Sequence, residues 1–235
     1  MSSEPDVVVP HKNALTARNG NKAEALLCTQ PTVKTAFETH FSKPVKSITQ
    51  ILGRKKADNC IEFTDGTKVL CQNKNGKCDG RGHSVDRRKA NLLTDSADLH
   101  TLLDSVCLKK GGAKPVIDKP ISETCVTACL LGTDAATRPD YFLHTTLDPT
   151  GSFITHLSIV PATKLIESVV ASLFPVMDVK RTCVHMSPHF YFQRKGGGKS
   201  DHAPDDIQLK MRFTPGASKA IPHPVDLTGL FTVLL

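Results

Sequence analysis

Asp58, Gln72 and Lys74 combine residue types that can do hydrolytic chemistry. A carboxylate and a side-chain carbonyl are oxygen ligands of the kind that a hard cation such as Mg²⁺ prefers. A lysine beside them can orient or deprotonate a water molecule bound to that cation, and the cation offsets charge on a phosphodiester. The three residue types therefore fit metal-assisted phosphodiester hydrolysis, provided that the fold brings them together.

The element that must bring them together is a predicted β-hairpin. Two strand-like runs, 59–63 and 67–72, flank the dipeptide Asp65-Gly66. Asp-Gly between two such runs is the strongest short signal for a hairpin turn. Asp58 stands at the entrance of the first run, and Gln72 and Lys74 stand at the end of the returning run.

Two registers are possible for this hairpin, and they differ in how they distribute the apolar residues. A two-residue loop divides these residues between both faces. A three-residue loop with Gly66 in the left-handed conformation pairs Ile61 with Val69 and gathers the apolar residues on one face. A buried face selects its own register, because a slip by one residue would turn the apolar side chains outward. We therefore predict the second register, which places Asp58, Gln72 and Lys74 side by side at the open end.

An acid that enters a hairpin, followed by acid-x-Lys on the returning strand, resembles the motif of the PD-(D/E)xK nucleases. Asp58 occupies the first position of that motif, and Gln72-Asn73-Lys74 occupies the second. Gln72 replaces the usual acid, and Ala57 stands where the family name has proline. The glycine-rich basic stretch 75–89 is predicted to be a loop, and it also resembles the segment that follows the catalytic lysine in some type II restriction endonucleases.

The resemblance implies a fold and an activity. The expected fold is α/β (α+β), with a central mixed β-sheet flanked by helices as in restriction endonucleases. The expected activity is Mg²⁺-dependent hydrolysis of double-stranded DNA at a short specific sequence by a homodimer. A catalytically inactive DNA-binding module and a structural protein associated with nucleic acid are the alternatives, and Gln72 is the feature that keeps the first of them open.

The resemblance also assigns roles to residues of this chain. Asp58 would be the main metal ligand, Gln72 an auxiliary ligand, and Lys74 the group that orients the water. Glu24 lies on a predicted helix over 22–28 with Asn19 or Asn21 as N-cap, and it would give a further contact to metal or water. Glu24 can equally be a favourable charge near a helix N-terminus. Glu62 lies on the same predicted hairpin face and is a second source of a carboxylate.

Basic and amide side chains elsewhere fit contacts with DNA. Basic groups near the hairpin can meet phosphates, and two alternating runs, 189–194 and 207–213, would turn Gln, Lys and Arg outward, where they can bind base edges. A solvated basic turn and a plain amphipathic strand pair are the competing interpretations. The predicted DNA contacts are Arg54, Lys55, Arg81, His83, Arg87, Arg88, Gln193, Arg194, Lys195, Lys199, Gln208, Lys210 and Arg212.

Composition sets wider limits. The 235 residues fit a single domain over 1–235, with 1–14 as a possibly mobile lead-in. Thirty Lys and Arg against 23 Asp and Glu give a net charge of +7, which favours an anionic partner. The sequence has no apolar run of membrane-spanning length and no secretion signal, so we expect an intracellular, cytoplasmic protein that does not bind membranes. Eight cysteines without a Cys-x-x-Cys pair are expected to be thiols, and zinc is disfavoured.

The remaining elements are expected to be structural. Apolar residues at helical spacing predict helices over 31–41, 94–108 and 162–173. Residues 124–131 fit either a helix or a strand. Strands are expected over 141–146 and 152–159 around an Asp148-Pro-Thr-Gly151 turn. The apolar end of the chain, 225–235, is predicted to be a strand that joins the main sheet.

Overall fold

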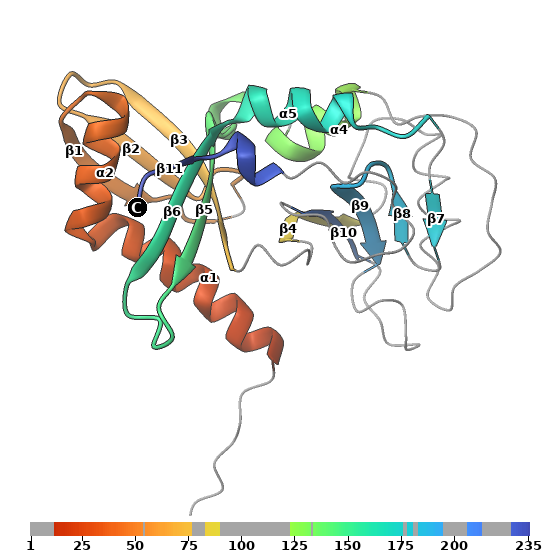
Figure 1. Ribbon diagram of the computed structural model, residues 1–235, viewed down its shortest axis with the longest axis horizontal. Helices are drawn as coiled ribbons and strands as arrows, with labels where there is room; N and C mark the ends of the chain where they lie inside the picture. The colour runs from red at the N-terminus through yellow and green to blue at the C-terminus, as the bar shows by residue number, and fades with distance from the viewer. Residues whose placement is uncertain are drawn as a thin grey trace, which may run out of the picture.

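The structure is a computed structural model that describes residues 12–53, 55–76, 83–89, 123–132, 134–175, 178–180, 183–194, 206–212 and 227–235. Its described part contains two β-sheets and four α-helices (Figure 1). None of the helices in these ranges is both long and apolar enough to cross a membrane.

The first sheet has six strands in the order β1-β2-β3-β5-β6-β11. β3 and β5 run parallel, whereas the other neighbouring pairs are antiparallel, so the sheet is mixed. The expected α+β class, with a mixed sheet flanked by helices, is confirmed. The strands are β1 (Val45–Gln50), β2 (Asn59–Phe63), β3 (Lys68–Asn75), β5 (Tyr141–Leu147), β6 (Ile154–Pro161) and β11 (Thr232–Val233).

Helices cover both faces of this sheet (Figure 1). α1 (Lys12–Thr29) and α2 (Pro31–Phe41) pack on one face, where Leu27 and Phe37 meet Ile61 and Leu143 in one buried cluster. α4 (Glu123–Leu131) and α5 (Ala162–Ala171) pack on the other face, against Phe142 and Val160. Side chains alternate between faces along a strand, so neighbours such as Phe142 and Leu143 belong to different clusters.

A second, five-stranded sheet is antiparallel throughout and has the order β4-β10-β9-β8-β7. Its apolar face joins the same buried cluster as α4 and α5, through residues such as Phe192 and Leu209. The strands are β4 (His83–Lys89), β7 (Asp178–Lys180), β8 (Cys183–His185), β9 (Phe190–Arg194) and β10 (Asp206–Met211). The two sheets therefore share a core.

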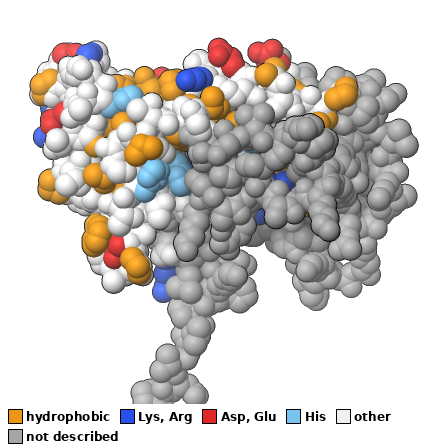
Figure 2. All heavy atoms as spheres, viewed as in Figure 1, with side chains coloured by type: hydrophobic (Ala, Val, Ile, Leu, Met, Phe, Trp, Pro, Cys, Tyr) orange, Lys and Arg blue, Asp and Glu red, His pale blue; other side chains and the backbone are white. Residues whose placement is uncertain are grey.

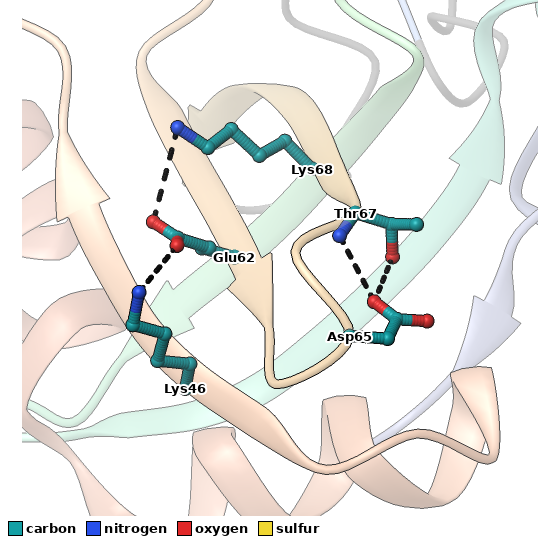
Figure 3. Close-up of polar contacts among 5 residues, drawn as sticks. All are labelled: Lys46, Glu62, Asp65, Thr67 and Lys68. Carbon is teal, nitrogen blue, oxygen red and sulfur yellow. Dashed lines mark hydrogen bonds and ion pairs between the residues drawn. The ribbon is translucent and has the colours of Figure 1, made fainter.

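The predicted hairpin is confirmed in both its strands and its register. Ile61 pairs with Val69, and Gly66 has a φ of 82°, as the three-residue loop requires. The Gly66 N–H donates to the Phe63 carbonyl at 3.0 Å, which closes the turn. The Asp65 carboxylate accepts from the Thr67 N–H and hydroxyl (Figure 3), at 2.9 and 2.6 Å.

Two expectations about the first 90 residues are wrong. α1 begins at Lys12, so Asn19 and Asn21 lie inside the helix and cap nothing. A glycine inside a helix costs only about 1 kcal/mol, and the burial of Ala23 and Leu27 outweighs that cost for Gly20. Residues 83–89, expected as part of a loop, form β4 because they pair with β10 along its length.

Several other elements match their predictions. α2 spans 31–41, α5 begins at Ala162, and the Gly151 N–H closes the Asp148 turn at 2.9 Å. Residues 123–131 are helical rather than extended. The C-terminal segment does join the first sheet, but only as the short strand β11, after a 3-10 helix over Leu227–Leu230. The helix expected over 94–108 lies outside the described residues.

Candidate active site

Asp58 lies at the open end of the hairpin, just before the chain enters β2. Its N–H still donates to the Cys71 carbonyl at 2.8 Å, but the preceding Ala57 N–H donates to Thr137 instead. The Asp58 carboxylate then accepts the next ladder N–H, that of Asn73, at 2.8 Å from Oδ2. The acid is thereby fixed against the strand that carries Gln72 and Lys74.

Lys74 is the second anchor of the site. Its Nζ lies 3.9 Å from Oδ2 of Asp58, and the two side chains are 14% and 22% exposed. An ion pair of this partial burial is screened less by water than a surface pair. The structure thus brings together the acid and the lysine that the sequence predicted to act together.

Glu24 reaches the same end of the hairpin from α1. Its Oε2 accepts from Nε2 of Gln50 at 2.7 Å. Asn59, one residue after Asp58, donates from Nδ2 to the Glu24 carbonyl at 3.2 Å and to Sγ of Cys28 at 3.4 Å. These bonds tie α1 to β1 and β2 at the site. Glu24 stands in the middle of α1, so its interpretation as a charge near a helix N-terminus is wrong.

The two carboxyl groups influence each other. Burial raises the pKa of Asp58, whereas Lys74, the Asn73 N–H and Lys56 lower it. Burial and the charge of Asp58 raise the pKa of Glu24, which its bond from Gln50 and the charge of Lys74 oppose. Two partly buried carboxylates that resist ionisation together are an arrangement that a bound cation relieves.

Gln72 supplies an unused oxygen. It is 4% exposed, and its Oε1 is buried without a hydrogen-bond partner in the part of the chain that the structure describes. The register puts it opposite Asp58, one step beyond the Asn59–Cys71 pair. A buried acceptor left unpaired costs about 1–3 kcal/mol. An amide oxygen and carboxylate oxygens are both hard donors, the kind that a divalent cation such as Mg²⁺ prefers.

The donor set is small. Within the described ranges, no group of three or more His, Cys, Asp and Glu side chains is arranged to hold a metal ion. Glu62 does not complete the set, because it binds Lys46 at 2.7 Å and lies 3.9 Å from Lys68, near the turn (Figure 3). Glu62 stands four positions after Asp58, roughly 13 Å along an extended strand. The expectation that Glu62 could replace the missing acid is therefore wrong.

The predicted DNA contacts near the hairpin are only partly described. Lys55 is exposed, as a phosphate contact would need, whereas Lys56 donates to the Cys129 carbonyl of α4 at 2.6 Å. Arg54, Arg81, Lys195 and Lys199 lie outside the described residues. His83, Arg87, Arg88 and Arg194 are strand residues of the second sheet whose side chains are not described.

The second sheet carries the other predicted contacts on one face. Gln193 pairs with Gln208, and Lys210 pairs with Tyr191, so these side chains share a face, as predicted. The Arg212 guanidinium lies over the Tyr191 ring at 4.5 Å, and that ring stacks on His185 at 5.0 Å. Tyr191 alternates with Phe190 and Phe192 and therefore lies on this outer face, yet it is only 7% exposed, because these two groups cover it.

Sequence reasoning missed the polar residues that frame the site. Asn59 and Asn73 are buried on the hairpin face that is otherwise apolar. In the predicted register they interrupt that face at its open end, next to Asp58 and Lys74, and this interruption was a usable signal. Thr145 on β5 binds Asn73, but nothing local in the sequence pointed to that pairing.

No known family model matches the chain, and no curated protein matches its sequence. Among solved structures, the restriction endonuclease MspI in complex with its cognate DNA is similar, with a TM-score of 0.42 and 10% identity. The match covers 86% of this chain and 93% of that chain. So distant a likeness carries no weight for function, which must be argued from the residues of the site.

Proposed function

We propose that the protein is a Mg²⁺-dependent endonuclease that hydrolyses phosphodiester bonds in double-stranded DNA. The observation that supports this most is the interaction of Asp58, Lys74 and Glu24 at the open end of the hairpin, the end that also carries Gln72. There Lys74 lies 3.9 Å from Asp58, Glu24 is held by Gln50, and the Gln72 oxygen is buried without a partner in the described structure.

Each residue has a role in this proposal. Asp58, Glu24 and Gln72 would hold Mg²⁺ through oxygen, with Asp58 as the main ligand. When bound, the cation supplies an acidified water molecule and offsets charge on the phosphodiester. The Lys74 ammonium would orient a water molecule toward the phosphorus and offset charge on the phosphate oxygens. The Asn73 N–H keeps the Asp58 carboxylate in place.

Recognition of DNA would use the basic character of the chain. A net charge of +7 attracts the phosphate backbone, and Gln193, Gln208, Lys210 and Arg212 offer amide and cationic donors on one sheet face. We propose that these groups read a short sequence. A symmetric site would be bound by a homodimer, since a two-fold protein matches a palindrome.

The proposal is tested by substituting Lys74. Lys74→Ala should cut plasmid and phage DNA at least about 100-fold more slowly than the unsubstituted protein, while retaining its circular dichroism spectrum. Lys68→Ala is the matched control, because Lys68 lies on the same hairpin at the turn end, with a side chain 61% exposed.

Discrete fragments that require Mg²⁺, vanish in EDTA and vanish with Lys74→Ala but not Lys68→Ala would support the nuclease. Equal cutting by both variants would contradict the assigned site.

A second function, a DNA-binding module without catalysis, is favoured by one observation. Gln72 is a neutral amide where the resembled motif has an acid, and a neutral ligand binds Mg²⁺ more weakly than a carboxylate. A gel shift with DNA but no cutting at any Mg²⁺ concentration would favour this alternative. If Gln72→Glu then conferred cutting, the site would be intact apart from that one ligand.

A further inference from the structure

The end of strand β3 is bonded to β5 both by strand pairing and by a side chain of β5. Asn75 pairs with Thr145 and Lys74 with His144, in the parallel part of the sheet. The Thr145 side chain is fully buried, and its hydroxyl Oγ1 lies 3.1 Å from Oδ1 of Asn73 and 3.4 Å from Oδ1 of Asn75. One hydroxyl thus spans the two asparagines on either side of Lys74.

The chain is fastened again just after Lys74, at Gly76. Its N–H donates to the Thr145 carbonyl at 3.0 Å. Its carbonyl accepts from Nε2 of His144 at 2.7 Å and from the Thr146 hydroxyl at 3.3 Å, so Nε2 of His144 carries the proton. Gly76 has a φ of 142°, which side chains other than glycine rarely adopt. Residues 144–146 therefore hold both flanks of Lys74.

These bonds lie beside the reactive groups rather than in a remote part of the core. Asn73 is the residue whose N–H holds Asp58, and it is the neighbour of Lys74 in the chain. His144 also lies 5.8 Å from His156 on β6, ring centre to ring centre. Figure 2 shows histidine side chains at the surface over β5 and β6, whereas His144 itself is only 4% exposed.

We propose that Thr145 is a positioning residue of the active site. Its hydroxyl fixes the Asn73 side chain, and this keeps the Asn73 N–H against Asp58 and Lys74 beside it. The inference rests on the proposed function, because the reaction that Thr145 serves is the proposed hydrolysis. A misplacement of reacting groups by about 1 Å can cost on the order of 100-fold in rate, so a hydroxyl that touches no substrate can still control turnover.

The competing explanation is that Thr145 only satisfies buried asparagine oxygens. Loss of its hydroxyl would then lower stability and leave turnover of the folded protein unchanged. Thr145→Val removes the hydroxyl and keeps the shape, whereas Thr145→Ser keeps the hydroxyl. Ser187→Ala is a control for stability alone: Ser187 is fully buried at the β8–β9 turn, where its Oγ accepts from the His189 N–H at 3.1 Å.

The first measurement is the rate of DNA cutting at temperatures where all variants are folded. Thr145→Val should lower kcat about 10- to 100-fold with little change in KM, and Thr145→Ser should recover most of that loss. Ser187→Ala should lose stability but keep its kcat. If Thr145→Val keeps the unsubstituted kcat, the inference is overturned while the nuclease proposal stands.

The second measurement does not depend on activity. Amide hydrogen exchange in the metal-free protein reports on the Asn73 N–H directly. Thr145→Val should speed exchange at Asn73 more than at strand residues away from the site, and Ser187→Ala should not. Equal protection of Asn73 in both variants would overturn the inference. If the unsubstituted protein cuts no DNA, the proposed function fails on its own, and Asn73 exchange still decides whether Thr145 positions Asp58.

Discussion

At the scale of single residues, the site pairs two carboxyl groups that are costly to ionise. The pKa of Glu24 is raised above its ordinary value of 4.5, mainly by burial and by Asp58. A carboxyl group with a raised pKa in the folded state holds its proton more tightly there than in the unfolded chain. The protein therefore loses stability as pH rises from the unfolded value through the raised one.

Glu24→Gln should remove that loss. The amide oxygen can still accept from Gln50, so we expect a higher melting temperature than that of the unsubstituted protein at neutral pH without Mg²⁺. The difference should shrink as the pH falls below 4.5, where Glu24 is protonated in both states. Added Mg²⁺ should reverse the order, because only the glutamate gives the cation a charged ligand. Thermal unfolding from pH 4 to 8, with Mg²⁺ or EDTA, measures this.

Glu62→Gln provides a control, because the pKa of Glu62 is lowered in the fold whereas that of Glu24 is raised. The bond from Lys46 lowers the pKa of Glu62, so its ionised form stabilises the fold above the unfolded pKa, and that stabilisation fades as pH falls through the lowered value. The Gln variant should melt at the same temperature or lower at neutral pH, and Mg²⁺ should not alter the comparison. A rise for Glu62→Gln equal to that for Glu24→Gln would contradict this assignment of charges.

At the scale of elements, the hairpin was predictable because burial and turn chemistry agree. Ile61, Phe63 and Cys71 needed a common face, and Gly66 needed a left-handed turn position; one register satisfies both. β4 was not predictable, because its basic sequence has no apolar alternation and it is a strand through its pairing with β10. Long-range pairing also hid Thr145, whose partner Asn73 is 72 residues away.

Gly20 and Gly66 test whether a glycine is needed for its backbone conformation, because one lies inside a helix and the other at a left-handed turn position. A Cβ at Gly20 or at Gly66 would meet nothing within 4 Å, so only the backbone decides the outcome. Gly20→Ala, inside α1, should stabilise the protein by up to about 1 kcal/mol. Gly66→Ala, at a φ of 82°, should destabilise it by about 1 kcal/mol. Urea unfolding of both variants is the measurement, and a stabilised Gly66→Ala would refute the assigned turn.

At the scale of the molecule, the two sheets share one buried cluster, which bears on the expectation of a single domain. Phe192 of the second sheet and Phe142 of the first are both fully buried there. Phe192→Ala should cost about 3–5 kcal/mol and shift a single unfolding transition. Phe37→Ala, in the other cluster of the first sheet, should shift the same transition. Two separate transitions, each sensitive to one variant, would mean that the halves unfold independently.

The parallel pairing of β3 with β5 affects the order in which the parts of the proposed active site form. The hairpin with Asp58 and Lys74 is local, and local pairs form early because little chain entropy is lost. Asn75 and Thr145 are 70 residues apart, and closing so long a loop is slower. During synthesis, the groups proposed to cut DNA would emerge well before the strand that holds them in place. The proposed active site would therefore not be held in its final geometry until more than half of the chain has been synthesised.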